Sequence, residues 1–157
     1  MRLFGKEHKV PRLQAAFGDI GYMYGGGAVN VKPWSEAPKN FVLFKEIIEE
    51  KLGVKFNFAL INQYVDGTHS VGWHQDNEKN IKKFTPIASY SLGADRRFLV
   101  RIKDKKQDRF TFEFPAGDDV LLVMGGACQV ECEHSVPKQA NVTGKRFNIT
   151  FRVMKQE

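Results

Sequence analysis

Cysteine is scarce in this chain, with only Cys128 and Cys132 among 157 residues. The two lie four residues apart on a predicted strand, and no further Cys or His stands at a zinc-finger spacing. This argues against a disulfide framework and against a structural zinc site. We therefore expect reduced thiols and an intracellular protein. The sequence also lacks an apolar run of membrane-spanning length, and its first residues, MRLFGKEHKV, lack the apolar stretch of a signal peptide.

Acidic residues are in the minority. The 24 Lys and Arg outnumber the 18 Asp and Glu, which gives a net charge of +6 and a sequence pI near 9.3. A basic excess favours a polyanionic partner such as nucleic acid, because cations placed along a phosphate backbone release condensed counterions. A solvated basic surface without a partner is the alternative that charge alone leaves open.

The length fits one domain, which we expect to span residues 1–157. Residues 1–35 are rich in Gly and predict an irregular or short-strand region. One helix is predicted over Pro38–Leu52, where apolar residues recur at helical spacing and Gly53 is placed to end the helix.

From residue 54 onward, short segments separated by turn signals predict a series of strands. The candidates are Lys55–Tyr64, Ile87–Leu92, Phe98–Lys103, Arg109–Phe114, Val120–Met124, Gln129–His134 and Arg146–Val153. The 13 Phe favour a sheet-rich core, because aromatic side chains pack well on pleated surfaces. The predicted fold class is mostly β with one main helix, as two facing sheets in a sandwich or jelly roll.

Histidine is also rare, and two of the four histidines suggest a metal site. His74 and Asp76 stand at positions i and i+2, so on an extended segment they point to the same side. His134 follows after a long stretch of predicted sheet and can return beside them. Two His and one carboxylate leave open coordination positions, the arrangement of non-haem iron(II) oxygenases. The alternatives are that His134 bonds only to backbone, or that His69 is a ligand instead.

The last predicted strand alternates between apolar and polar side chains. The alternation sends the odd-numbered residues, from Phe147 to Val153, into the core and leaves the even-numbered ones on the opposite face. That face carries Arg146 and Arg152, whose guanidinium groups can clamp the two carboxylates of a small diacid. An exposed polar face is the alternative, but an arginine that faces a barrel interior needs an anion.

Several motifs now agree in order and spacing. They are Asn62-x-Tyr64, His74-x-Asp76-x-Glu78, His134 and Arg146-x-Asn148-x-Thr150-x-Arg152. Together they resemble the signature of the AlkB family of Fe(II)/2-oxoglutarate-dependent dioxygenases, over nearly the whole chain. The stretches Phe4-Gly5-Lys6, Val10-Pro11-Arg12, Gly18-Asp19, Lys32-Pro33-Trp34 and Ser91-Leu92-Gly93-Ala94 are similar to the members that repair alkylated duplex DNA.

This resemblance implies a double-stranded β-helix (jelly-roll) catalytic core over residues 54–157. It implies a helical and hairpin N-terminal extension, with a nucleotide-recognition region over 1–35. The implied activity is oxidative dealkylation of N-alkylated bases of the 1-methyladenine and 3-methylcytosine type in DNA. Fe(II) would be the cofactor, and 2-oxoglutarate and O₂ would be consumed. Succinate, CO₂ and formaldehyde would be released. A monomer that acts on a flipped base is implied, located in a nucleus, a bacterial cytoplasm or, for a viral protein, the host cell.

The resemblance also assigns roles to residues. His74, Asp76 and His134 would hold the iron. The residues implied to bind 2-oxoglutarate are Asn62, Tyr64, Arg146, Asn148 and Arg152, with Arg146 at the distal carboxylate and Arg152 near the metal.

Five residues are implied at the substrate: Glu78, Tyr24, Trp34, Phe4 and Arg101. Glu78 would read the cationic methylated base, because a nearby carboxylate favours a positive charge; a solvated turn residue is the alternative. Phe4 would fill the gap left by the flipped base, unless it belongs to a frayed terminus. Where the relatives place a stacking Phe, this chain has Gly26, which puts one wall of the pocket in doubt.

Two further readings stay open. The same chemistry on RNA is one, since a flipped methylated base looks alike in both polymers. The other is a non-catalytic module that binds nucleic acid, although binding alone would not require a complete set of metal and co-substrate residues.

Overall fold

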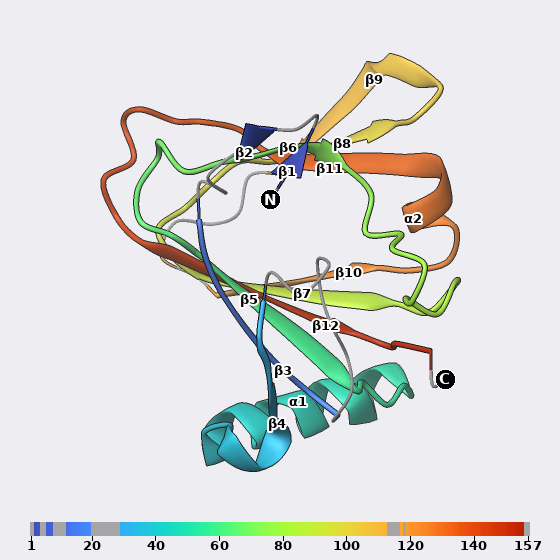
Figure 1. Cartoon of the computed structure of the whole chain (residues 1–157). Helices are drawn as coiled ribbons and strands as arrows, with labels where there is room; N and C mark the ends of the chain where they lie inside the picture. Colours follow the sequence, from blue (N-terminus) through green and yellow to red (C-terminus); the bar gives the residue numbers. More distant parts are fainter. Residues whose placement is uncertain are drawn as a thin grey trace.

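The computed structural model describes residues 2–3, 6–7, 12–19, 29–112, 117 and 119–155. Figure 1 shows two facing layers of strands, with one long helix packed on the outer side of the larger layer. In chain order the elements are β1 (Arg2–Leu3), β2 (Lys6–Glu7), β3 (Leu13–Gly18), β4 (Val31–Pro33), a 3-10 turn η2 (Trp34–Glu36), α1 (Lys39–Leu52), β5 (Phe58–Tyr64), β6 (Val71–His74), β7 (Ile87–Gly93), β8 (Phe98–Ile102), β9 (Lys105–Phe112), β10 (Val120–Met124), α2 (Cys128–Glu131), β11 (Cys132–Val136) and β12 (Arg146–Arg152).

The larger sheet has the strand order β10-β7-β12-β5-β3-β4, and the smaller one has the order β6-β11-β8-β9. Strands distant in sequence are therefore neighbours, as expected of a jelly roll rather than a simple meander. The predicted jelly-roll core is confirmed. The N-terminal region contributes directly to it, because β3 pairs antiparallel with β5, and β4 pairs parallel with β3. The β8–β9 hairpin projects beyond the rest of the molecule (Figure 1).

The strand β12 is central to the larger sheet, and both of its faces are covered. Its odd-numbered side chains pack toward α1, where Ile149 and Phe151 join the cluster formed by Phe41 and Phe44. Its even-numbered polar side chains point into the space between the sheets and are all buried. The expected alternation is present, but the polar face is the one turned to the interior. Such a face requires internal partners for every polar group.

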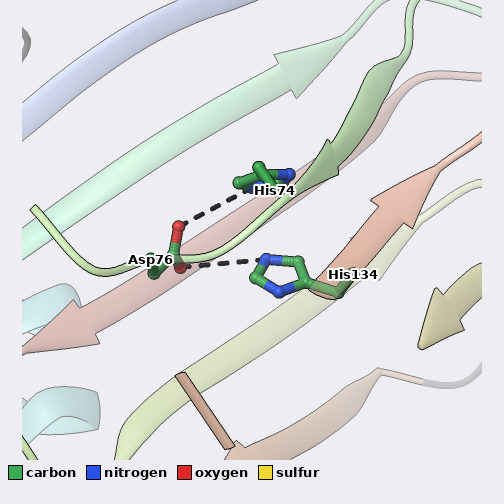
Figure 2. A group of neighbouring side chains, drawn as sticks. All are labelled: His74, Asp76 and His134. Carbon is green, nitrogen blue, oxygen red and sulfur yellow. Dashed lines mark ion pairs between the residues drawn. The ribbon is translucent and has the colours of Figure 1, made fainter. Parts of the chain in front are cut away.

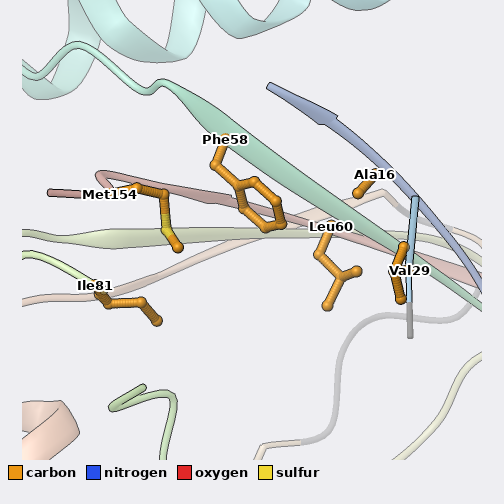
Figure 3. Close-up of a cluster of buried hydrophobic side chains, with 6 residues drawn as sticks. All are labelled: Ala16, Val29, Phe58, Leu60, Ile81 and Met154. Carbon is orange, nitrogen blue, oxygen red and sulfur yellow. The ribbon is translucent and has the colours of Figure 1, made fainter. Parts of the chain in front are cut away.

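A separate apolar cluster closes one end of the space between the sheets. Phe58 and Leu60 of β5 meet Ile81 and Met154, with Ala16 and Val29 beside them (Figure 3). Ile81 belongs to the loop that follows the predicted metal ligands, so this cluster anchors that loop to the core.

The predicted helix is confirmed at Lys39–Leu52, and Gly53 ends it in a left-handed conformation with φ 64°. The strand predicted over Gln129–His134 is present, but its predicted first residue was wrong. Residues Cys128–Glu131 form the helical turn α2, and the strand β11 begins at Cys132. In that turn the amide of Cys132 donates to the carbonyl of Cys128, and both cysteines are free. Among the helices described, none is long and apolar enough to cross a membrane.

Candidate metal and co-substrate site

Two strands of the smaller sheet bring the predicted metal ligands together. His74 ends β6 and lies directly opposite His134 of β11 in an antiparallel pair, so both imidazoles project from one face. Asp76 follows in the loop and turns back between them (Figure 2). Its carboxylate oxygens lie 3.6 Å from Nε2 of His74 and 3.9 Å from Nε2 of His134. One ligand atom from each residue falls within 4.8 Å of the others.

The lowered pKa values of His134 and Asp76 suit a divalent cation. The pKa of His134 is lowered to about 4, mainly by burial; His74 and Arg152 also lower it, and Asp76 opposes them. Burial would raise the pKa of Asp76, but Arg152 and the two histidines outweigh it, and that pKa falls below its ordinary value. Nδ1 of His74 lies 2.8 Å from the carbonyl of Gly72, which leaves Nε2 turned to the site. Two imidazole nitrogens and a carboxylate are the donors that Fe(II) takes in oxygenases.

Two glutamines lock the metal-binding loop to the segment that carries His134. The amide of Asp76 donates to Oε1 of Gln129 at 2.9 Å. In the other direction, Nε2 of Gln75 donates to the carbonyls of Val130 at 2.9 Å and Cys132 at 3.2 Å. The turn α2 therefore fixes Asp76 relative to β11.

Arg152 joins the metal site to the larger sheet. It is 2% exposed, and its Nη2 lies 2.9 Å from Asp76 Oδ2. Its Nη1 lies 3.8 Å from Oε1 of Glu78, whose side chain is 38% exposed. Oε2 of Glu78 is buried and has no hydrogen-bond partner among the described residues. The carboxylate thus has one oxygen available to a donor at the edge of the metal site.

The interior face of the larger sheet carries a polar row across four neighbouring strands. Ser91 of β7 pairs with Asn148 of β12, which pairs with Asn62 of β5 and then Gln14 of β3. Nδ2 of Asn148 donates to Oγ of Ser91 at 3.2 Å, and Gln14 donates to Oδ1 of Asn62 at 2.8 Å. Arg12 donates to the same Asn62 oxygen.

Arg146 lies one step further along this face. Its Nη2 donates to Oγ of Ser91 at 2.7 Å, and its guanidinium lies 5.1 Å from the ring centroid of Tyr64, which is directly opposite on β5. The side chain is 3% exposed, and Nη1 has no partner within the described part of the chain. Burial lowers the pKa of Arg146 more than Tyr64 raises it. A buried guanidinium with an unsatisfied nitrogen is a site for an anion.

The structure does not bring every predicted site residue here. Trp34 packs against Phe41, at 6.3 Å between ring centroids, in the cluster beneath α1 on the other face of the sheet. The turn η2 leads straight into α1 and carries the indole with it. Tyr24, Phe4 and Gly26 lie outside the described residues.

Arg101 lies on the outer face of the smaller sheet. Its Nε donates to Oε2 of Glu133 at 2.7 Å, and its guanidinium sits 4.2 Å from the ring centroid of Trp73. Neighbouring residues on a strand face opposite ways, so Trp73 and Glu133 point away from the adjacent His74 and His134.

The residues that the sequence did not reveal fall into two kinds. Ser89 and Ser91 alternate on β7, so strand periodicity would have placed them on one face, although not which face. Gln75 and Gln129 gave no signal, because their roles depend on contacts between segments distant in sequence. Arg12 and Ser91 stand in stretches that resemble the family, but the sequence assigned them no role.

Comparison with known proteins agrees with this geometry. A family model described as the 2OG-Fe(II) oxygenase superfamily matches residues 4–152. The mouse protein "DNA oxidative demethylase ALKBH2" is 37% identical over 159 residues, covering 97% of this chain and 65% of its own length. The bovine "Alpha-ketoglutarate-dependent dioxygenase alkB homolog 3" is 33% identical over 153 residues, covering 94% of this chain and 53% of its own length.

The chain thus spans between half and two thirds of the length of these curated relatives. Among solved structures, that of OsALKBH1 is similar with a TM-score of 0.56 at 21% identity, over 71% of this chain and 64% of that one. This last likeness concerns the fold alone.

Proposed function

The chain belongs to the 2OG-Fe(II) oxygenase superfamily, within its AlkB family, and from that premise we propose that it oxidatively dealkylates N-alkylated bases in DNA. The observation that carries the proposal is the pairing of a His-Asp-His triad with a buried arginine whose Nη1 lacks a partner among the described residues. A metal that activates oxygen and a dicarboxylate co-substrate need such a pair of sites.

His74, Asp76 and His134 would hold the Fe(II), since the lowered pKa values keep His134 neutral and Asp76 ionised, and Nε2 of His74 faces the same point. When bound with 2-oxoglutarate and O₂, the iron supplies the oxidation of an N-alkyl carbon, and succinate, CO₂ and formaldehyde are the products. Arg152 keeps Asp76 ionised and oriented by its 2.9 Å contact. The glutamine contacts hold the loop so that the three donors converge without rearrangement.

Arg146 would bind the distal carboxylate of 2-oxoglutarate through Nη1, while its Nη2 stays on Ser91. Asn62, Tyr64 and Asn148 line the same interior face, and Arg152 would lie near the carboxylate next to the metal. The acid would then run along β12 between its two arginines. Because both arginines are buried, each charge pair would be stronger than at the surface.

Glu78 would read the base. Alkylation at adenine N1 or cytosine N3 makes the base cationic, and the free carboxylate oxygen of Glu78 favours that charge over a neutral base. Residues 1–35, including Phe4 and Tyr24, would form the nucleotide-recognition region. Arg101 would contact the opposite strand, provided that a phosphate displaces Glu133. We further propose that the protein is a monomer and that it acts on a base flipped out of the duplex. It would then be located in the compartment that holds the DNA.

The test is mass spectrometry of 1-methyladenine and 3-methylcytosine oligonucleotides after incubation with Fe(II), 2-oxoglutarate and ascorbate. We expect loss of one methylene mass unit per lesion together with equimolar succinate. A protein that binds the oligonucleotides but forms no succinate is a binding module, and the proposed activity is then wrong.

Matched DNA and RNA oligonucleotides with the same lesion separate the two polymers. Faster turnover of the RNA would assign the same chemistry to RNA.

A further inference from the structure

Phe84 has an unusual backbone and an unusual exposure. It is the one non-glycine residue with positive φ, 62°, within the described ranges. Its side chain is 67% exposed, more than any other large hydrophobic side chain in the described part of the molecule. A bulky residue in the left-handed region destabilises the fold, and here no burial of the ring offsets that cost. Glycine would suit the turn better, so stability does not explain the phenylalanine.

Contacts on both sides of Phe84 anchor the backbone of the loop of residues 78–86 to the core. Ile81 is 6% exposed and packs in the interior cluster of Figure 3. The amide of Lys82 donates to the carbonyl of Val153 at 2.8 Å, and Oγ1 of Thr85 donates to the carbonyl of Lys82 at 2.6 Å. A ring presented by an anchored turn loses little conformational entropy when it binds a partner.

The surroundings of the ring are basic and continuous with the metal site. Lys82 and Lys83 precede Phe84 directly and are exposed, as is Lys79. Lys155 brings a further exposed cation, since its Nζ donates to the carbonyl of Lys79 at 2.7 Å. The loop begins at Glu78, which contacts Arg152 beside the triad. This surface therefore suits a negatively charged occupant, and its loop begins at the edge of the metal site.

We propose that Phe84 stacks on a base of the strand that carries the target nucleotide, with Lys82 and Lys83 on its phosphates. An aromatic ring among cations is the arrangement that binds single-stranded nucleic acid, because each base offers a π-face and each linkage a charge. The inference rests on the proposed function and adds a contact outside the pocket. An apolar pocket of a protein partner would accept the ring but would gain little from the flanking lysines.

The test compares Phe84→Gly and Phe84→Trp with Leu43→Ala, a control at a 56% exposed position on the outer helix. Binding of the full chain to a fluorescent single-stranded 1-methyladenine oligonucleotide is measured by anisotropy. We expect Phe84→Gly to raise Kd by about tenfold or more, and Phe84→Trp and Leu43→Ala to stay near wild type. In parallel, Phe84→Gly should raise Tm by a few degrees, because glycine relieves the left-handed backbone.

A stabilised Phe84→Gly variant with unchanged Kd overturns the inference and leaves the proposed function intact. A lower Tm for Phe84→Gly also overturns it, because the ring would then serve the fold. Salt dependence adds an independent readout. Lys83→Ala should reduce the slope of log Kd against log salt by ~1, whereas Phe84→Gly should not change that slope. If wild type binds no oligonucleotide at any salt concentration, the proposed function itself fails.

Discussion

The guanidinium of Arg146 is buried, and its Nη1 has no hydrogen-bond partner among the described residues. Replacing it by the similarly sized methionine removes the charge and leaves the shape. We expect Arg146→Met to weaken 2-oxoglutarate binding ~10- to 150-fold, since hydrogen bonds to charged groups contribute about 1.5–3 kcal/mol. Calorimetric titration of the Mn(II)-loaded protein measures this, with the exposed Arg97→Ala as control. Equal affinity in both variants would contradict the assignment.

His134 makes stability depend on pH. Its pKa in the folded protein is about 4, below the ordinary value of 6.5. The unfolded chain therefore binds a proton more readily, and the stabilisation is complete above pH 6.5 and is lost as pH falls toward 4. We expect the free energy of unfolding of the metal-free protein to fall by about 3 kcal/mol over that window. Asp76, whose pKa is also lowered, adds to the loss at still lower pH.

Urea titrations at pH 7, 5.5 and 4.5 check this, with His134→Gln as the comparison. In the variant, the free energy of unfolding should depend much less on pH between 6.5 and 4. A slope equal to that of the wild type would mean that another group carries the effect.

The sequence predicted the individual site residues to different degrees. His74 and Asp76 stand out because a two-residue spacing on an extended segment fixes a shared side. Trp34 was assigned to the pocket on resemblance alone, and the structure places it beneath α1. An indole beside a proline suits either location, so nothing local distinguishes them.

At the scale of elements, the turn α2 acts on the metal site without supplying a ligand. Oε1 of Gln129 accepts a hydrogen bond from the backbone amide of Asp76 at 2.9 Å. Removing such an outer contact weakens metal binding by roughly 10- to 100-fold in known sites. We expect Gln129→Ala to raise the Kd for Co(II) within that range, and Gln129→Glu, which keeps the acceptor, to lie closer to wild type. The Co(II) absorption spectrum gives the affinity, and unchanged affinity for Gln129→Ala would show that the contacts of Arg152 and Gln75 hold Asp76 without Gln129.

Element types followed from the sequence where one pattern dominated. The helix at Lys39–Leu52 and the strand β12 each have a clear period and a clear end. The segment before His134 contains only one turn of helix, which is too short to show a helical period. The prediction therefore extended the strand of His134 backward over residues that are helical. Strand order was not predictable, because β12 pairs with β5 and β7 across long separations in the chain.

At the scale of the whole molecule, the candidate site joins the two sheets. His74 and His134 come from the smaller sheet, whereas Arg146 and Arg152 come from β12 of the larger one. Motif order indicated the chemistry, but only the fold shows that the His-Asp-His triad and the two arginines face each other between two layers.

A ligand held between the sheets should therefore stabilise the whole fold. At 100 times Kd, binding adds about 2.7 kcal/mol, which is ~5–10 °C in Tm for a chain of this size. We expect Mn(II) and 2-oxoglutarate together to give a larger shift than the sum of the two alone, because the acid needs both the metal and Arg146. Differential scanning fluorimetry measures this, and in Arg146→Met the acid should add little while Mn(II) keeps its own shift. If 2-oxoglutarate stabilises the metal-free protein as strongly as the Mn(II) form, the acid lies elsewhere, and the two sites do not form one centre.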